Sequence, residues 1–79
     1  MRKHAHLYRV QREGPRGGRQ IRWRAFGDDG ETIAEETTRQ YTEQRLQNKG
    51  YTHVTRYEGT ARPAEMAAHQ ADLAMGADK

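Results

Sequence analysis

The chain has 79 residues, a formal net charge of +3 and no cysteine. That length leaves room for one small domain with a thin core, and the lack of cysteine excludes disulfides and cysteine-ligated metal sites. There is no serine, and no run of about 20 apolar residues that would span a membrane. Since no apolar secretion signal follows the basic start, we expect a cytoplasmic protein.

Aliphatic side chains are scarce, because Leu, Ile, Val and Phe together number eight. So low a fraction favours disorder, but the modest net charge, four tyrosines and one tryptophan oppose it. We therefore predict a marginally stable domain that gains from burial against a second copy, as a homodimer, or against another partner.

Charge is divided unevenly along the chain. Residues 1–24 hold eight lysines and arginines against one glutamate, whereas residues 25–48 hold two arginines against six acidic residues. A basic half of this kind is typical of proteins that bind a polyanion. A bias in composition, with ordinary solvated faces, explains the same pattern equally well.

The first strand is predicted over residues 7–13, after a polar and unstructured start. Its alternation directs Tyr8 and Val10 toward the core. The residues expected to face solvent are Leu7, Arg9 and Gln11. The segment Gly-Pro-Arg-Gly-Gly at 14–18 then predicts a flexible, basic hairpin loop. It lacks the Gly-Lys-Ser/Thr ending of a phosphate-binding loop, so no nucleotide site is predicted there.

The centre of the chain, RQIRWRAFGDDGETIAEE, predicts a β-hairpin. Strands are expected over residues 19–26 and 31–36, joined by the three-residue loop 28–30 with Gly30 in the left-handed region. The core-facing side comprises Ile21, Trp23 and Ala25, with Trp23 at the centre of the core. The opposite side comprises Gln20, Arg22, Arg24 and Phe26.

The loop length determines the predicted register of this hairpin. The expected opposite pairs are Ala25 with Ile33, Trp23 with Glu35, and Arg22 with Glu36. A two-residue turn would instead move Ile33 to the arginine side, so we prefer the longer loop.

Residues 37–49 are predicted to form one helix. Thr37 with Gln40 three residues later fits a capping box, and Gly50 follows as a C-terminal stop. The thin apolar stripe comprises Tyr41, Thr42 and Leu46. A helix of about 12 residues is marginal alone, so this one must dock on a sheet.

A last strand is predicted over residues 51–58, followed by an Ala-rich segment. Within that segment Pro63 suits the first position of a helix and Glu65 its first turn. The packing face comprises Met66, Gln70, Leu73 and Ala74. We expect this helix to fold back on the sheet or to pair with a second copy; the alternative is a disordered tail.

Together these elements predict an α+β fold of order β-β-β-α-β-α. A small antiparallel sheet of three to four strands would have a helix packed on one face. Residues 1–60 would form the sheet and its helix, and residues 61–79 an Ala-rich C-terminal helix or tail.

Catalytic chemistry is weakly represented. Without Ser or Cys the remaining nucleophiles have no recognisable base beside them, and the acidic pairs at 28–29 and 35–36 are typical of a turn and a strand end. His4 and His6 have the spacing of two metal ligands on a strand, but two ligands without a third predict no metal site. His53 is expected to be a partly buried packing or hydrogen-bonding residue. We predict no enzyme, no catalytic residue, no cofactor and no metal.

An arginine-rich sheet face is the candidate binding site. Arg9 of the first strand and Arg22 and Arg24 of the second are expected to share the surface away from the core. The full predicted nucleic-acid-binding set is Arg9, Arg12, Arg16, Arg19, Arg22 and Arg24. Arginine forks bind phosphates and guanine edges, and Phe26 would stack on a base. Pairing of Arg22 with Glu36 would instead neutralise part of this face.

The segment Trp23-Arg24-Ala25, followed by Asp29-Gly30-Glu31 and then a helix, resembles the arm-type DNA-binding domain of phage tyrosine integrases. The similarity spans about residues 7–50 and implies a three-stranded sheet placed in the major groove, with a helix behind it. Arg-Trp-Arg with Gly-Glu-Thr-Ile-Ala also resembles the small YegP-type bacterial domains. The chain departs from arm-type domains by adding a last strand and an Ala-rich helix, and by lacking a catalytic domain.

We therefore predict a small non-enzymatic accessory protein of phage or mobile-element type, with nucleic acid, specifically duplex DNA, as its partner. The alternative is a protein-interaction module, an inhibitor or adaptor that acts through a sheet edge or the C-terminal helix. The direction in which the arginines point distinguishes the two.

Overall fold

The computed structural model describes residues 3–77, which form a four-stranded sheet and two helices. In chain order the elements are β1 (His4–Glu13), β2 (Arg19–Gly27), β3 (Thr32–Glu36), α1 (Arg39–Asn48), β4 (His53–Arg56) and α2 (Pro63–Ala77). The predicted α+β class and the order β-β-β-α-β-α are confirmed. Neither helix in the described part of the chain is long and apolar enough to cross a membrane.

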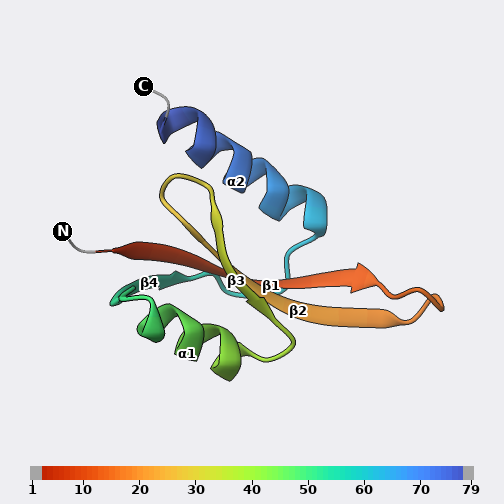
Figure 1. Ribbon diagram of the computed structural model, residues 1–79. Coiled ribbons are helices and arrows are strands. Elements are labelled where there is room, and N and C mark those ends of the chain that lie inside the picture. Colours follow the sequence, from red (N-terminus) through yellow and green to blue (C-terminus); the bar gives the residue numbers. More distant parts are fainter. Residues whose placement is uncertain (1–2, 78–79) are drawn as a thin grey trace.

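The sheet has the strand order β3-β2-β1-β4. β1 with β2, and β2 with β3, pair antiparallel as predicted, whereas β4 pairs in parallel with β1 and makes the sheet mixed. The two helices lie on opposite sides of the sheet (Figure 1). β1 is therefore an inner strand, and both of its faces must carry apolar side chains.

Alternation along the inner strands divides the core into two clusters. The α1-side core comprises Ala5, Leu7, Ala25 and Leu46, each at most 1% exposed. The α2-side core comprises Val10, Phe26 and Met66, each at most 5% exposed. The prediction that Leu7 faces solvent is wrong, because α1 covers its side of β1.

The two large aromatic residues of β2 lie in places other than those predicted. Phe26 is fully buried beneath α2, so it does not lie on an open face where a base would stack. Trp23 is only partly buried and packs at the margin of the α1-side core instead of at its centre. Phe26 differs from the prediction because the C-terminal helix α2 covers the side of the sheet that the sequence leaves open. On the other side the centre of the core is taken by Leu7, Ala25 and Leu46.

Four residues, 28–31, separate β2 from β3, and the pair Gly27 and Glu31 closes the predicted three-residue loop 28–30. The Gly27 N–H donates to the Glu31 carbonyl over 3.0 Å, and Gly30 has a φ of +82°. Phe26 then pairs with Thr32, in the predicted register, but Ile33 has no partner on β2 and forms a β-bulge. Beyond that bulge the pairing moves by one residue.

This shift corrects the predicted register of the hairpin. Past the bulge the opposite pairs are Ala25 with Ala34, Arg24 with Glu35, and Trp23 with Glu36. Since directly opposite residues lie on the same face, the bulge moves Glu35 to the side of the sheet that carries Arg24.

α1 is shorter than predicted at its beginning. Its N-cap is Thr38, whose hydroxyl accepts the Tyr41 N–H over 3.2 Å, so the expected cap at Thr37 is wrong. The predicted stop at Gly50 is confirmed: Gly50 has a positive φ of +85°, and the two N–H groups after the helix bond back in a Schellman motif. Thr42 and Leu46 are buried as expected, whereas Tyr41 is 60% exposed.

Pairing with β4 explains why residues 4–6 belong to the first strand. The parallel ladder pairs His4 with His53, and from Ala5 onward β1 also pairs with β2, so residues 4–6 are not unstructured as predicted. β4 itself is shorter than expected, yet the chain continues along β1 after it. The Tyr57 N–H donates to Leu7 O over 3.1 Å, and the Ala61 N–H donates to Arg9 O over 2.9 Å.

The C-terminal helix α2 folds back on the sheet through the predicted face. Met66 is 2% exposed in the α2-side core. The Gln70 amide donates to the Gly30 carbonyl over 2.7 Å and to the Thr32 hydroxyl over 2.8 Å. The helix therefore contacts both the inner strand β1 and the β2–β3 loop.

Replacing Phe26 with alanine should lower the free energy of unfolding by about 3–5 kcal/mol, because it empties the α2-side core. Trp23→Ala should cost less, since part of its ring already faces solvent. Urea unfolding followed by far-ultraviolet circular dichroism compares the two variants directly. A larger loss for Trp23→Ala would contradict this division of the core.

Gly30→Ala should displace α2, because an added Cβ would lie 2.5 Å from the Gln70 carbonyl oxygen and 2.8 Å from the Ala74 nitrogen. Gly17 is the matched control: its φ is also positive, at +76°, but nothing lies within 4 Å of its added Cβ. Gly17→Ala should cost only the backbone penalty of about 1–2 kcal/mol. We expect a clearly larger loss of unfolding free energy for Gly30→Ala; equal losses would argue against the close helix contact.

Candidate functional site

The six predicted arginines do not share one face. Across the β1–β2 ladder Arg9 lies opposite Trp23, whereas Tyr8 lies opposite Arg24 and Val10 opposite Arg22. Arg9 is therefore on the α1 side of the sheet, where its guanidinium lies 5.9 Å from the centre of the Trp23 ring. The prediction that Arg9 joins Arg22 and Arg24 is wrong, because neighbouring antiparallel strands place directly opposite residues on the same side.

Arg22 and Arg24 are held by one carboxylate. Arg24 Nε donates to Glu35 Oε1 over 2.6 Å, and Arg22 Nε lies 3.3 Å from Glu35 Oε2. All three side chains are only about a quarter exposed, at 24–26%. The predicted partner of Arg22, Glu36, instead pairs with Arg45 on α1 over 2.5 Å. The sequence predicted that an acidic residue of β3 would neutralise Arg22. The bulge at Ile33 makes that residue Glu35 instead of Glu36.

The same arrangement controls the protonation of Glu35. Burial alone would raise the pKa of this carboxyl, but the hydrogen bond and charge of Arg24, with the charges of Arg22 and Arg12, lower it below its ordinary value. Glu35 is therefore an ionised anchor near neutral pH. Two of the six predicted binding residues consequently have a structural partner.

Arg12, Arg16 and Arg19 belong to a different part of the molecule. They are exposed residues of the hairpin end, by which we mean residues 11–21 of β1, β2 and their loop. Figure 1 shows this end extending past both helices. Among the described residues, no carboxylate lies within ion-pair distance of these three arginines or of Arg9. Their charge is available to a ligand.

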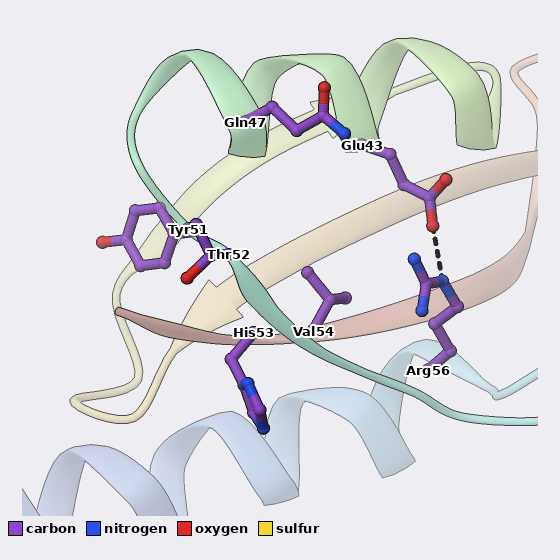
Figure 2. Close-up of a pocket in the computed structure, with 7 residues that line it drawn as sticks. All are labelled: Glu43, Gln47, Tyr51, Thr52, His53, Val54 and Arg56. Carbon is purple, nitrogen blue, oxygen red and sulfur yellow. Dashed lines mark hydrogen bonds and ion pairs between the residues drawn. The ribbon is translucent and has the colours of Figure 1, made fainter. Parts of the chain in front are cut away.

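A groove lies between α1 and β4, with a volume of about 560 Å³ (Figure 2). Glu43 and Arg56 face each other across it and form an ion pair of 2.5 Å. Figure 2 also shows Val54 pointing toward α1 while His53 points to the opposite side of β4. Because its two opposite charges neutralise each other, we assign no binding chemistry to this groove.

A cluster of histidine and tyrosine side chains on the α2 side was not predicted. The rings of Tyr8 and Tyr57 stack with centroids 4.3 Å apart, and the Tyr8 hydroxyl is hydrogen-bonded to His69 Nδ1 over 2.8 Å. Burial raises the pKa of both tyrosines; the charges of Tyr57 and Glu65 add to the effect at Tyr8, and the charge of Asp28 adds to it at Tyr57. His6 contacts His69 and His4, with ring centroids 5.2 and 4.5 Å apart.

Part of this cluster has a signal in the sequence. His4, His6 and Tyr8 continue one alternation, so extending the first strand back to residue 4 would have placed all three on one side. His53 lies opposite His4 on β4, with ring centroids 5.9 Å apart, and is exposed, not partly buried as predicted. The residues that β4 and α2 add, such as His53 and His69, cannot be predicted from alternation within the first strand.

No family model, curated protein or solved structure matches the chain.

Glu35→Gln should lower the free energy of unfolding at pH 7 by about 1.5 kcal/mol, the low end for hydrogen bonds to charged groups. Because folding lowers the pKa of Glu35, its carboxylate stabilises the fold above the ordinary pKa, and this contribution disappears as the pH falls through the folded value. The difference from wild type should therefore shrink between pH 7 and about pH 3.

Urea unfolding at the two pH values measures this difference. Glu58→Gln is the control, because Glu58 is exposed and, within residues 3–77, has no ion-pair partner. It should leave stability unchanged at both values. A Glu35→Gln effect that persists undiminished in acid would contradict the assigned role of the ion pair.

Proposed function

We propose that the chain binds nucleic acid and that the hairpin end is the contact surface. The observation that carries this proposal is that the exposed arginines of this end, Arg12, Arg16 and Arg19, have no carboxylate partner among the described residues. Arg9, further along β1 on the α1 side, is also exposed and unpaired there and would supply a fourth contact. Arginine forks bind phosphate oxygens through two hydrogen bonds, and such contacts supply most of the affinity of basic proteins for nucleic acid.

The shape of the hairpin end supports duplex DNA as the partner. The major groove admits a two-stranded β-ribbon, and residues 11–21 form such a ribbon with neither helix beside it (Figure 1). Arg16, in the loop, would reach deepest into the major groove, and Arg12 and Arg19 lie on the two strands that flank the loop. Arg22 and Arg24 would hold the base of the ribbon through Glu35 and make no contact of their own.

The resemblance to the arm-type domains of phage integrases supports DNA binding, but the contact surface proposed here differs from theirs. In those domains a sheet face enters the groove. Here α1 and α2 cover both faces of the sheet, and Phe26 is buried beneath α2. The free end of the ribbon is the part of the basic half that a duplex would reach. A phage or mobile-element accessory role stays part of the same proposal.

The decisive experiment is a fluorescence anisotropy titration of labelled duplex and single-stranded DNA at several salt concentrations. Four phosphate contacts imply a slope of log affinity against log salt of about −3.6. The triple variant Arg12→Gln, Arg16→Gln, Arg19→Gln should bind more weakly, and its slope should fall toward about −0.9. Circular dichroism should show an unchanged fold, because all three side chains are exposed.

A matched triple variant separates local contact from overall charge. Arg39→Gln, Arg45→Gln, Arg62→Gln also removes three positive charges from exposed positions, all outside the hairpin end. Because Arg39 and Arg45 pair with Glu43 and Glu36, circular dichroism should first show that this variant is folded. This variant should keep nearly the wild-type slope. Equal effects of the two triple variants, or no salt-dependent binding by the wild type below about 100 μM, would contradict the proposal.

The second candidate function is binding of a protein partner or a second copy at the edge of β3. Within residues 3–77 this strand is paired with β2 alone, which leaves its outer edge open to β-strand addition except where Lys49 Nζ donates to Ile33 O over 2.9 Å. A dimer built there would have a melting temperature that rises with protein concentration. This candidate takes precedence if the nucleic-acid titration fails.

A further inference from the structure

Two imidazole nitrogens and a carboxylate converge where β1 begins. His4 Nδ1 and His6 Nε2 each lie 2.8 Å from the same oxygen of Asp28, Oδ1. One ligand atom from each of the three residues lies within 4.8 Å of the other two. We propose that His4, His6 and Asp28 form a binding site for a divalent transition-metal ion, with Zn²⁺ as the expected ion.

The fold supplies the third ligand that the sequence pattern lacks. His4 and His6 are two residues apart on β1, so their side chains lie on the same side of the sheet. The β1–β2 ladder pairs His6 with Phe26 and Ala5 with Gly27, and Asp28 follows directly in the β2–β3 loop. The three-residue length of that loop therefore brings the carboxylate next to the two imidazoles.

The second nitrogen of each imidazole is also held in place. His4 Nε2 is hydrogen-bonded to the Thr55 hydroxyl over 2.6 Å, and His6 Nδ1 to the Tyr57 hydroxyl over 2.8 Å. Metal-binding histidines typically use the non-ligating nitrogen in this way, which orients the ring and determines its tautomer. A hydroxyl both donates and accepts, so each can accept the ring N–H when the other nitrogen binds a metal.

The ligand set favours particular ions. Imidazole suits Zn²⁺, Cu²⁺ and Ni²⁺, whereas Mg²⁺ and Ca²⁺ prefer all-oxygen sites. Three protein ligands leave at least one position of a tetrahedral Zn²⁺ for water. The site is open on that side, because the Asp28 side chain is 63% exposed while those of His4 and His6 are 25% and 9% exposed.

The two distances from Asp28 to the imidazole nitrogens require only a small adjustment. Ligand atoms around a tetrahedral Zn²⁺ lie about 3.3 Å apart, given metal–ligand bonds of about 2.0–2.2 Å. The two 2.8 Å contacts are somewhat shorter than this separation. Rotation of the exposed Asp28 carboxylate would supply the difference without moving β1.

A purely structural role for the cluster makes a different prediction. If Asp28 serves only to accept hydrogen bonds from two ring N–H groups, then asparagine at this position retains an acceptor oxygen and a good turn residue. A metal site would instead lose its charged ligand in that variant. Asp28→Asn therefore distinguishes the two roles while leaving the loop intact.

The test is a titration of the untagged full chain with Zn²⁺ by isothermal calorimetry, since a histidine tag would bind the ion itself. Titration with Co²⁺ followed by visible absorption reports the coordination geometry. We expect one ion per chain, reversal by a chelator, and a melting temperature that rises with the metal concentration. The site lies at the opposite end of β1 from the hairpin end, so this result is independent of nucleic-acid binding.

Variants assign the ligands. Asp28→Asn, His4→Gln and His6→Gln should each weaken Zn²⁺ binding by more than about 100-fold, beyond the effect typical of an outer-shell residue. His53→Gln is the matched control, because His53 lies near His4 but contributes none of the three ligand atoms; it should bind as wild type. Since His6 is buried, His4→Gln and Asp28→Asn decide the outcome if His6→Gln does not fold.

Absence of Zn²⁺ and Co²⁺ binding at millimolar metal would overturn the proposal. Binding that Asp28→Asn and His4→Gln leave unchanged would also overturn it, as would loss of binding in the His53→Gln control.

Discussion

The hydrogen-bonding position of β1 is the constraint on which the rest of the structure depends. β1 is paired with β2 from Ala5 to Glu13, and on its other edge with β4 and then with the segment that leads to Ala61. An inner strand with both edges paired has two faces to cover, and its alternate residues Leu7 and Val10 enter two different cores. α1 and α2 are needed on opposite sides for that reason.

The two ends of β1 carry different kinds of side chain because different elements pack around them. At its beginning, β4 and α2 surround a group of aromatic and imidazole side chains that are linked by hydrogen bonds. At its other end, past Gln11, the strand has β2 as its one neighbour among the described residues until the loop, and the side chains there are arginines and other polar residues. A small domain with few aliphatic residues thus places its polar chemistry at both extremities of one strand.

The arginines of the basic half fall into two groups, one paired with Glu35 and one exposed at the hairpin end, and composition alone does not show this division. The bulge at Ile33 places Glu35 beside Arg22 and Arg24, the two arginines nearest the core. Partly buried charges are costly unless paired, so these two must have a partner in the folded state. The excess charge is therefore concentrated on the hairpin end, where water solvates it and where a polyanion would meet it first.

Local pattern in the sequence determined the strands of the central hairpin, the left-handed Gly30, the stop of α1 at Gly50 and the packing face of α2. Each depends on residues within a few positions of one another, on alternation, helical spacing or the conformational freedom of glycine. The uneven distribution of charge along the chain was also evident from the sequence. For the same reason Ile21, Trp23 and Ala25 were correctly grouped on one side of β2.

Only the tertiary structure decided what covers each side, which residues the register aligns and which side chains meet. Period-2 alternation states that Phe26 and Arg24 share a side, but not that α2 buries one of them. A single bulged residue moved every later pair of the hairpin, and no local signal marks it. The convergence of His4, His6 and Asp28 depends on pairing between segments more than twenty positions apart. Such contacts form because the whole chain must satisfy its backbone hydrogen bonds and bury a scarce set of apolar side chains at the same time.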